Sequence, residues 1–167
     1  EQKTEKPSEI LNLLDNGISE TFSKNINDTS VKDGMDISLM VIDKNHRIIE
    51  YAGAFNPLLI IRNNKITEIK GNRFSIGRTE NTDQKFDNHT FHYKPGDMAY
   101  IFTDGYSDQF GGPLGKKIKH RRFRHLLLSV SSLPLLKQRD FLNENIENWK
   151  GKLEQVDDIL IIGVRLE

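Results

Sequence analysis

The feature that most constrains the fold is a short apolar run that ends in an aspartate and a glycine. Residues 98–103 read MAYIFT, and Asp104 and Gly105 follow directly. A short run rich in aromatic and branched side chains, bounded by turn residues, is typical of a strand that is buried on both faces. We therefore predict that this strand delivers Asp104 to the rim of a sheet, where its carboxylate can act as a metal ligand.

Turn sequences divide much of the chain into short strands. The segments 43–46 (DKNH), 62–65 (RNNK) and 94–97 (KPGD) combine residues that favour tight turns. Tight turns indicate antiparallel pairing, because parallel strands require a long crossover connection. The predicted strands are residues 37–42, 47–52, 58–61, 66–69, 89–93, 98–103 and 159–164. Three of them are strongly apolar, so we expect both of their faces to be covered, namely residues 37–42, 98–103 and 159–164.

Three further segments have the apolar spacing of an amphipathic helix. Pro7 suits a first helical turn, and Gly151 suits a C-terminal stop. The apolar positions of the three predicted helices are Ile10, Leu13, Leu14, Ile18 and Phe22, then Phe123, Leu126, Leu127 and Val130, and finally Leu135, Leu142, Ile146 and Trp149. We expect a second sheet to cover one face of these strands and helices to cover the other. This arrangement predicts an α+β fold, an antiparallel β-sandwich flanked by helices.

Composition argues against several classes of function. The 167 residues fit one domain, and 24 basic side chains against 24 acidic ones give a net charge of zero. Zero net charge argues against a general affinity for nucleic acid or for an anionic membrane. The absence of cysteine removes disulfide and thiolate chemistry.

The sequence also bears on where the chain lies in the cell and on the nature of its first residues. The sequence has no apolar run long enough for a membrane helix, and its start is polar rather than signal-like. We expect this chain to be cytoplasmic, with any membrane attachment of the parent protein made by upstream domains. Residues 1–6 are expected to be disordered or a linker.

Three aspartates can meet at one rim of the predicted sheet. Asp104 ends one apolar strand, and Asp157 and Asp158 precede another. If these strands are antiparallel neighbours, the end of one lies beside the start of the other. Hard oxygen donors without cysteine or an evident histidine partner favour Mg²⁺, Mn²⁺ or Ca²⁺ over Zn²⁺. The alternative is an ordinary turn at Asp104 and a strand cap at the paired aspartates, and spacing alone leaves both interpretations open.

Several motifs in a fixed order carry a resemblance to a known family. Residues 102–105 read FTDG, and residues 155–160 read QVDDIL. Three earlier segments agree in order, namely residues 33–37 (DGMDI), 51–58 (YAGAFNPL) and 74–77 (FSIG). Together they resemble the bacterial metal-dependent PPM (PP2C-like) protein serine/threonine phosphatases of the stage II sporulation protein E type. The resemblance covers residues 7–167.

The resemblance implies a hydrolase site with two ions of Mn²⁺ or Mg²⁺, in which a metal-held water attacks phosphorus directly. Asp104 and Asp157 match metal ligands of the family and would carry the catalysis, while Asp158 would be an outer or alternative ligand. The implied function is hydrolysis of phosphoserine or phosphothreonine on a regulatory protein. That substrate would resemble an anti-sigma-factor antagonist and belong to bacterial signal transduction.

The resemblance also implies structural glycines and further properties of the site. Gly105 would allow the tight turn after Asp104, and Gly53 and Gly77 would let the backbone pass close to the site. No separate organic cofactor, nucleic acid or membrane contact is expected, and a homodimer is left open.

Two elements of the family pattern are absent from the sequence. The family also uses an aspartate on an N-terminal strand and another in a turn before a Gly-His-Gly segment, and neither occurs here. We therefore interpret residues 7–167 as the C-terminal part of a phosphatase domain, N-terminally incomplete. Little or no phosphatase activity is predicted for the chain alone, because cation affinity depends on the number of charged ligands. The alternative is a non-catalytic interaction or dimerisation module of the same fold.

A basic run follows the central motif. Residues 116–125 contain six lysines or arginines and two histidines. Such a run can bind phosphate or nucleic acid, but without an interleaved aromatic beyond Phe123 a solvated helix start is the simpler interpretation. It can still help to dock an acidic partner surface. Residues 108–112, just before it, are either the root of a mobile flap or a plain turn, and we expect Trp149 to belong to the core.

Overall fold

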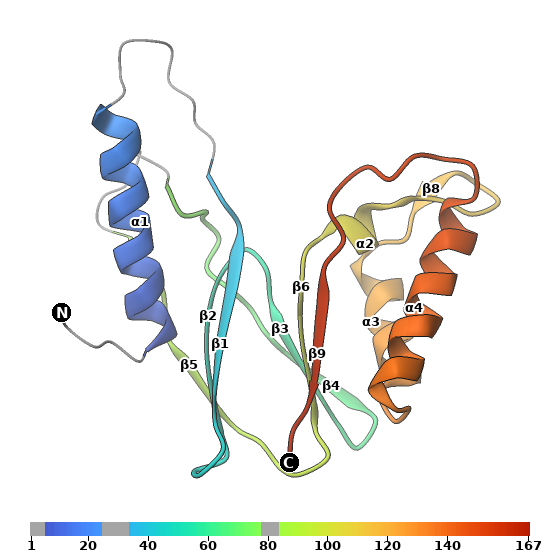
Figure 1. The fold of residues 1–167 in the computed structure, drawn as a ribbon, viewed down its shortest axis with the longest axis horizontal. Helices are drawn as coiled ribbons and strands as arrows, with labels where there is room; N and C mark the ends of the chain where they lie inside the picture. Colours follow the sequence, from blue (N-terminus) through green and yellow to red (C-terminus); the bar gives the residue numbers. More distant parts are fainter. Residues whose placement is uncertain (1–5, 25–33, 78–83) are drawn as a thin grey trace. The chain divides into compact units, whose positions relative to one another are not determined.

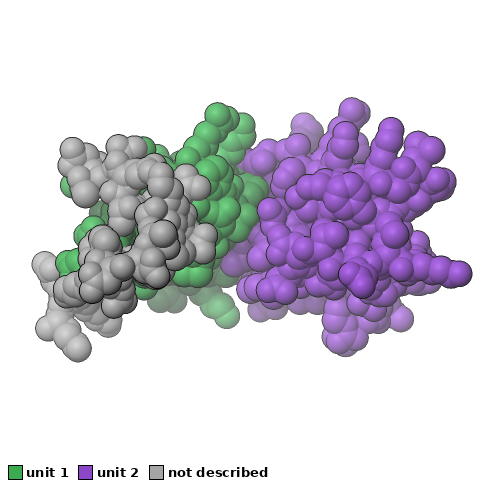
Figure 2. Space-filling model, turned by 90° about the horizontal axis from the view of Figure 1, so that it is seen from above, with its two compact units in different colours: residues 1–58, 69–94 green, residues 59–68, 95–167 purple. Residues whose placement is uncertain are grey.

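The structure of the chain, a computed structural model, describes residues 6–24, 34–77 and 84–167 (Figure 1). The chain divides into two compact units, formed by residues 1–58 and 69–94 and by residues 59–68 and 95–167 (Figure 2). Each unit has its own antiparallel sheet and its own hydrophobic core. Of the predicted linker at residues 1–6, only Lys6 lies within the described residues.

The first unit is built on a three-stranded antiparallel sheet. Its elements are α1 (Pro7–Lys24), β1 (Ile37–Asp43), β2 (Ile48–Ala54) and β5 (His89–His92). The strand order is β1-β2-β5, with Ile37 opposite Ala54 and Ile48 opposite His92. The predicted hairpin is therefore confirmed, and Asp43 fixes its turn by accepting hydrogen bonds from the backbone N–H groups of Asn45 (2.9 Å) and His46 (3.0 Å).

The predicted helix α1 is confirmed, but it buries only part of the apolar stripe predicted for it. Leu11 is fully buried in the core of this unit, whereas Leu13 and Leu14 are 62% and 42% exposed. Pro7 is buried and Ile18 partly buried, and both lie on the same side of the helix as Leu11. The predicted stripe was right for Ile18 and wrong for Leu13 and Leu14, because the helix carries apolar residues on more than one side and spacing alone does not decide which side meets the sheet.

The second unit is built on a four-stranded antiparallel sheet in the order β4-β3-β6-β9. Its strands are β3 (Leu58–Arg62), β4 (Lys65–Ile69), β6 (Met98–Phe102) and β9 (Ile161–Arg165). Three helices and a small hairpin follow β6, namely α2 (Gly105–Asp108), β7 (Phe110–Gly111), β8 (Lys116–Lys117), α3 (His120–Val130) and α4 (Leu135–Lys150). The predicted strands and the two longer helices are confirmed, while α2 and the β7–β8 hairpin were not predicted.

The core of the second unit joins β6 to the helices. Phe123 is fully buried and contacts two aromatic rings, that of Phe102 edge-on at 4.9 Å between centroids and that of Tyr106 stacked at 4.7 Å. The apolar positions predicted for α3 and α4 mostly face this core, since Phe123, Leu127, Leu142 and Ile146 belong to it. This packing fixes the short helix α2 and the end of β6 to a rigid base.

The expectation that three strands are covered on both faces holds for only one of them. β6 is buried at four of its five positions. β1 is only half-buried along its length, and Ile162 of β9 is 43% exposed. Both β1 and β9 are edge strands of their sheets in the described chain, which leaves them less covered than a central strand. No helix in the described parts of the chain is both long and apolar enough to cross a bilayer.

We predict that the Arg62–Asp97 ion pair stabilises the second unit. Asp97 is 3% exposed, and its carboxylate accepts hydrogen bonds from Arg62. Arg62 Nε donates to Oδ1 (2.9 Å) and to Oδ2 (3.0 Å), and Arg62 Nη2 donates to Oδ2 (2.5 Å). Asp97→Ala should lower the free energy of unfolding by about 1–3 kcal/mol, because it leaves the guanidinium without its buried partner. The matched control Asp140→Ala removes an exposed pair with Arg139 and should cost below about 0.5 kcal/mol in the same urea titration. Equal losses for the two variants would contradict the prediction.

A second prediction concerns alkaline pH. Burial raises the pKa of Tyr100 from its ordinary value of 10.0 to about 12, and its hydroxyl donates to Gln138 Oε1 (2.6 Å). The unfolded chain loses this proton first, so the stabilisation is complete below pH 10 and is lost as the pH rises towards 12. Urea titrations across this window should show falling stability, with a shallower fall in Tyr100→Phe. An identical slope in the variant would show that other groups control alkaline unfolding.

Candidate functional site

The pairing of β6 with β9 brings two predicted acidic segments together at one end of the sheet. Phe102 is opposite Ile161, and the backbone N–H of Thr103 continues the pairing by donating to the Leu160 carbonyl (3.0 Å). Thr103 Oγ1 also donates to the Asp158 carbonyl (2.7 Å) and accepts from the N–H of Leu160 (3.0 Å). The hydroxyl thus joins the end of β6 to the segment that leads into β9.

Asp104 lies where β6 passes into helix α2. Its backbone carbonyl accepts hydrogen bonds from the N–H of Asp108 and from Ser107 Oγ, both at 2.9 Å. Its carboxylate makes no capping hydrogen bond to α2, and the residue is exposed. Asp104 therefore does not have the helix-capping role that would be the ordinary explanation of an aspartate at this position.

Gly105 lies directly against the paired aspartates. A Cβ atom at this position would be 2.4 Å from the carbonyl oxygen of Asp158 and 3.2 Å from that of Asp157. No side chain larger than hydrogen fits without moving the backbone. Because Gly105 is helical and has no positive φ, the glycine is needed for close approach of two chain segments rather than for the tight turn that we predicted.

Asp157 and Asp158 lie in an exposed turn before β9. Asp157 Oδ1 accepts a hydrogen bond from the N–H of Asp158 (2.7 Å), and the Asp157 carbonyl accepts one from Gln155 Nε2 (2.8 Å). These two contacts stabilise the turn, and only one of them uses a carboxylate oxygen of Asp157. The backbones of Asp104, Asp157 and Asp158 therefore converge, as the strand pairing predicted.

The donor chemistry of this rim fits a hard cation. Carboxylate oxygens are the ligands that Mg²⁺ and Mn²⁺ prefer, and no thiolate is available in the sequence. Within the described residues, however, no three His, Cys, Asp or Glu side chains gather closely enough to hold an ion. The three aspartates supply suitable oxygens but not a complete coordination shell.

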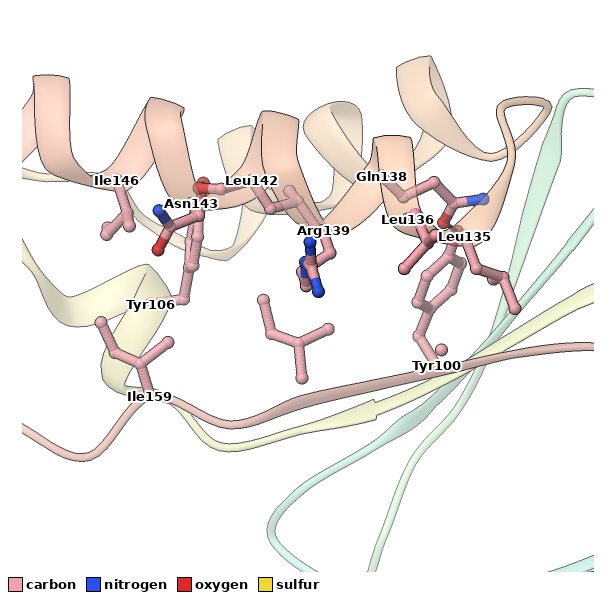
Figure 3. Close-up of a pocket in the computed structure, with 12 residues that line it drawn as sticks. Tyr100, Tyr106, Leu135, Leu136, Gln138, Arg139, Leu142, Asn143, Ile146 and Ile159 are labelled. Atoms are coloured by element: carbon pink, nitrogen blue, oxygen red, sulfur yellow. Dashed lines mark hydrogen bonds between the residues drawn. The ribbon is translucent and has the colours of Figure 1, made fainter.

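An apolar cavity in the second unit is a separate feature. It has a volume of about 410 Å³ and lies between α4 and the strands β6 and β9. Figure 3 shows Leu142 and Ile146 on its helix side and Ile159 on its strand side, with Arg139 reaching from α4 towards the strands. No acidic side chain of the described residues lines it. The cavity therefore lacks the groups that metal-dependent phosphoryl chemistry needs.

Comparison with known proteins identifies the family. The family model of stage II sporulation protein E (SpoIIE) matches residues 1–167. The chain belongs to the SpoIIE family. A search of curated proteins gives no match.

Several solved structures share the fold of this SpoIIE-family chain. The SiaA-PP2C domain of Pseudomonas aeruginosa is 29% identical with a TM-score of 0.86, over 97% of this chain and 61% of that chain. The phosphatase domain of SpoIIE from Bacillus subtilis is 12% identical with a TM-score of 0.57, over 99% and 76%. A serine/threonine phosphatase of S. agalactiae is 15% identical with a TM-score of 0.62, over 100% and 75%. The predicted α+β, PP2C-like fold is thus confirmed, and the chain spans 61% of the SiaA-PP2C chain.

Two glycines predicted to lie at the site belong to the first unit of this SpoIIE-family chain. A Cβ atom on Gly53 would be 2.7 Å from the Asn56 carbonyl oxygen, so this glycine is needed for a close backbone contact within that unit. Gly77 has a φ of +84° and donates its N–H to Asp15 Oδ1 (2.6 Å). Local packing explains both glycines, and their role at a catalytic site stays a prediction.

Sequence reasoning missed the residue that joins the two acidic segments. Thr103 was treated only as the last residue of a strand, although its hydroxyl contacts both Asp158 and Leu160. A hydroxyl residue between an apolar strand and an aspartate is a weak signal, because its partners lie more than 50 positions away in the sequence. Only the strand pairing reveals them.

We predict that Gly105→Ala destabilises the chain by about 1–3 kcal/mol, because the added methyl group meets the Asp158 backbone and has no room to move. The measurement is the free energy of unfolding in urea. Gly17→Ala is the matched control, since a Cβ atom there meets nothing within 4 Å. Gly17 lies inside α1, so its replacement should be neutral or stabilising by up to about 1 kcal/mol. Equal stability of the two variants would show that the close approach at Gly105 is not required.

Proposed function

We propose that this chain is part of a metal-dependent protein serine/threonine phosphatase. The observation that carries the proposal is the convergence of Asp104 with Asp157 and Asp158 at the β6–β9 rim, in a chain of the SpoIIE family. Matching phosphatase folds in the SiaA-PP2C domain and in B. subtilis SpoIIE support it. The reaction is hydrolysis of a phosphate ester on serine or threonine.

The aspartates would hold the cation. In this proposal Asp104 and Asp157 bind Mn²⁺ or Mg²⁺ through carboxylate oxygens, and Asp158 supports them as an outer or alternative ligand. Such an ion supplies Lewis-acid activation of water and neutralises charge on the phosphoryl group. Thr103 and Gly105 position the ligands, because they hold the two acidic segments in contact.

The substrate would be a phosphorylated regulatory protein of the anti-sigma-factor-antagonist kind. A structure of the RsbU and RsbW domains of Rv1364c from Mycobacterium tuberculosis matches with a TM-score of 0.63 and 16% identity, over 87% of this chain and 38% of that chain. At this identity the match supports the fold, while the regulatory substrate and a cytoplasmic location are proposed from the family resemblance.

The chain by itself would have little activity. The sequence lacks the family's N-terminal aspartate and its Asp turn before Gly-His-Gly, and it spans 61% of the SiaA-PP2C chain. The three aspartates alone then give too few charged ligands for firm cation binding.

A second candidate function is a non-catalytic interaction or dimerisation module. The observation that favours it is that no metal-binding group of three side chains occurs among the described residues. The two candidates differ in what a longer chain does. An enzyme gains activity when the missing ligands are supplied, and an interaction module does not.

We predict that a chain extended to the length of the SiaA-PP2C domain releases phosphate from a phosphoserine peptide in Mn²⁺. Asp104→Asn and Asp157→Asn should each lower kcat/KM by about 100-fold or more, since even outer partners of metal ligands contribute roughly 10- to 100-fold. Asp140→Asn, an exposed position on α4, is the matched control and should keep full activity. Full activity in Asp104→Asn would overturn the site assignment, and an inactive extended chain would favour the interaction module. Robust Mn²⁺-dependent turnover by the 167 residues alone would contradict the predicted incompleteness.

A further inference from the structure

The β7–β8 hairpin forms one side of a second hollow in the second unit. This hollow has a volume of about 400 Å³ and is lined by basic and apolar side chains. Lys116, Lys117 and Lys119 supply charge, while Leu114 and Trp149 supply apolar surface. In the part of the chain that the structure describes, no acidic side chain lines this hollow.

We propose that this hollow binds an acidic segment of a protein partner that also carries an apolar anchor residue. The lining favours a partner with both properties. Lysine cations attract a negatively charged segment, and covering the apolar wall lowers the free energy only when the covering group is itself apolar. That the partner is the phosphorylated substrate rests on the proposed phosphatase function.

The hairpin is held firmly against α4. The N–H of Gly112 donates to the Trp149 carbonyl (2.8 Å), and Trp149 Nε1 donates to the Gln109 carbonyl (3.1 Å). A Cβ atom on Gly111 would come within 1.9 Å of the Trp149 carbonyl oxygen, so the two segments touch. Residues 108–112 are therefore neither a plain turn nor a loosely attached flap, and the hollow is largely formed before a ligand arrives.

The cations around the hollow are only partly neutralised. Lys117 Nζ pairs with Asp108 Oδ2 (2.6 Å). Lys116 and Lys119 are exposed, and no acidic side chain among the described residues forms an ion pair with either of them. Like charges this close repel one another, and a negatively charged partner relieves that repulsion.

The hollow is linked to the candidate metal ligand by a short chain of hydrogen bonds. The N–H of Lys119 donates to the Ser107 carbonyl (2.7 Å), and Ser107 Oγ donates to the Asp104 carbonyl (2.9 Å). All these residues belong to the second unit. A partner held in the hollow is therefore held at a fixed position relative to Asp104.

A protein segment fits the hollow better than nucleic acid does. The Arg122 guanidinium lies over the Trp149 ring at 4.2 Å from its centroid, and Gly112 also lies against that ring. The indole therefore has little free face for stacking a base, which is the usual aromatic contribution to single-strand binding. Leu114, 77% exposed at the hairpin tip, instead offers contact to an apolar side chain.

The test measures binding of a fluorescent peptide of aspartate and glutamate with one central phenylalanine, by anisotropy, in EDTA. Lys116→Glu/Lys119→Glu should weaken binding about tenfold at low salt, since surface charges act mainly through screened attraction. The control Lys65→Glu/Lys137→Glu makes the same charge change at exposed positions away from the hollow and should leave the affinity unchanged. Thermal melting of both variants checks that the fold is kept.

A second variant separates the apolar contribution from the charge. Leu114→Ser should weaken binding of the phenylalanine peptide several-fold. It should leave the affinity for a peptide with alanine at that position unchanged, because only the phenylalanine contacts the apolar wall. Equal affinity of the wild type and the Lys116→Glu/Lys119→Glu variant would overturn the proposal. Tighter binding of single-stranded DNA of equal charge, through the same lysines, would also overturn it in favour of a nucleic-acid site.

The outcome is independent of the phosphatase proposal. Binding is measured without metal, and Asp104→Asn should leave it unchanged. If the wild-type chain does not bind the peptide although an extended chain has phosphatase activity, the docking hollow alone is rejected. Binding by a chain that shows no phosphatase activity even when extended would reject the enzyme proposal alone.

Discussion

The antiparallel pairing of β6 with β9 is the interaction on which the candidate site depends. It places the end of one strand beside the start of the other, which is where Asp104 and the paired aspartates lie. Thr103 reinforces the junction by bonding to both Asp158 and Leu160, and the lack of a side chain at Gly105 lets the segments touch. Without this register the three acidic residues would be distant points in the sequence with no common surface. The chemistry proposed for the chain is therefore a consequence of strand pairing.

The helices of the second unit make that rim rigid. Phe123 packs against Phe102 at the end of β6 and against Tyr106 in α2, so the segment on either side of Asp104 is held by one buried aromatic cluster. The β7–β8 hairpin is held in turn by Trp149 from α4. The carboxylate proposed to be catalytic and the basic hollow proposed for docking then share a single scaffold. Such preorganisation lowers the entropic cost of binding a partner and presenting it to the reacting groups.

Much of the fold follows from local patterns in the sequence. Turn residues at 43–46 and 62–65 predict antiparallel hairpins, and the run at 98–103 predicts a buried strand that ends at Asp104. Burial was harder to predict. α1 buries Leu11 rather than Leu13 and Leu14, and β9 leaves Ile162 exposed. An apolar side chain is buried only if another element covers it, and the sequence of a helix or strand does not state which of its sides is covered. The hydrogen bond from Trp149 to Gln109 could not be predicted either, because the two residues lie 40 positions apart in the sequence.

The sequence by itself determined the strands and longer helices, the family resemblance and the identity of the three candidate ligands. Periodicity, turn chemistry and ordered motifs are local properties, so they can be seen without knowing the fold. Tertiary structure decided which face of α1 is buried, why Gly105 must be a glycine, and that the basic run forms part of a hollow beside Trp149. Each of these depends on contacts between residues far apart in the chain. Such contacts exist only once the strands have paired and the helices have packed, which is why no local pattern shows them.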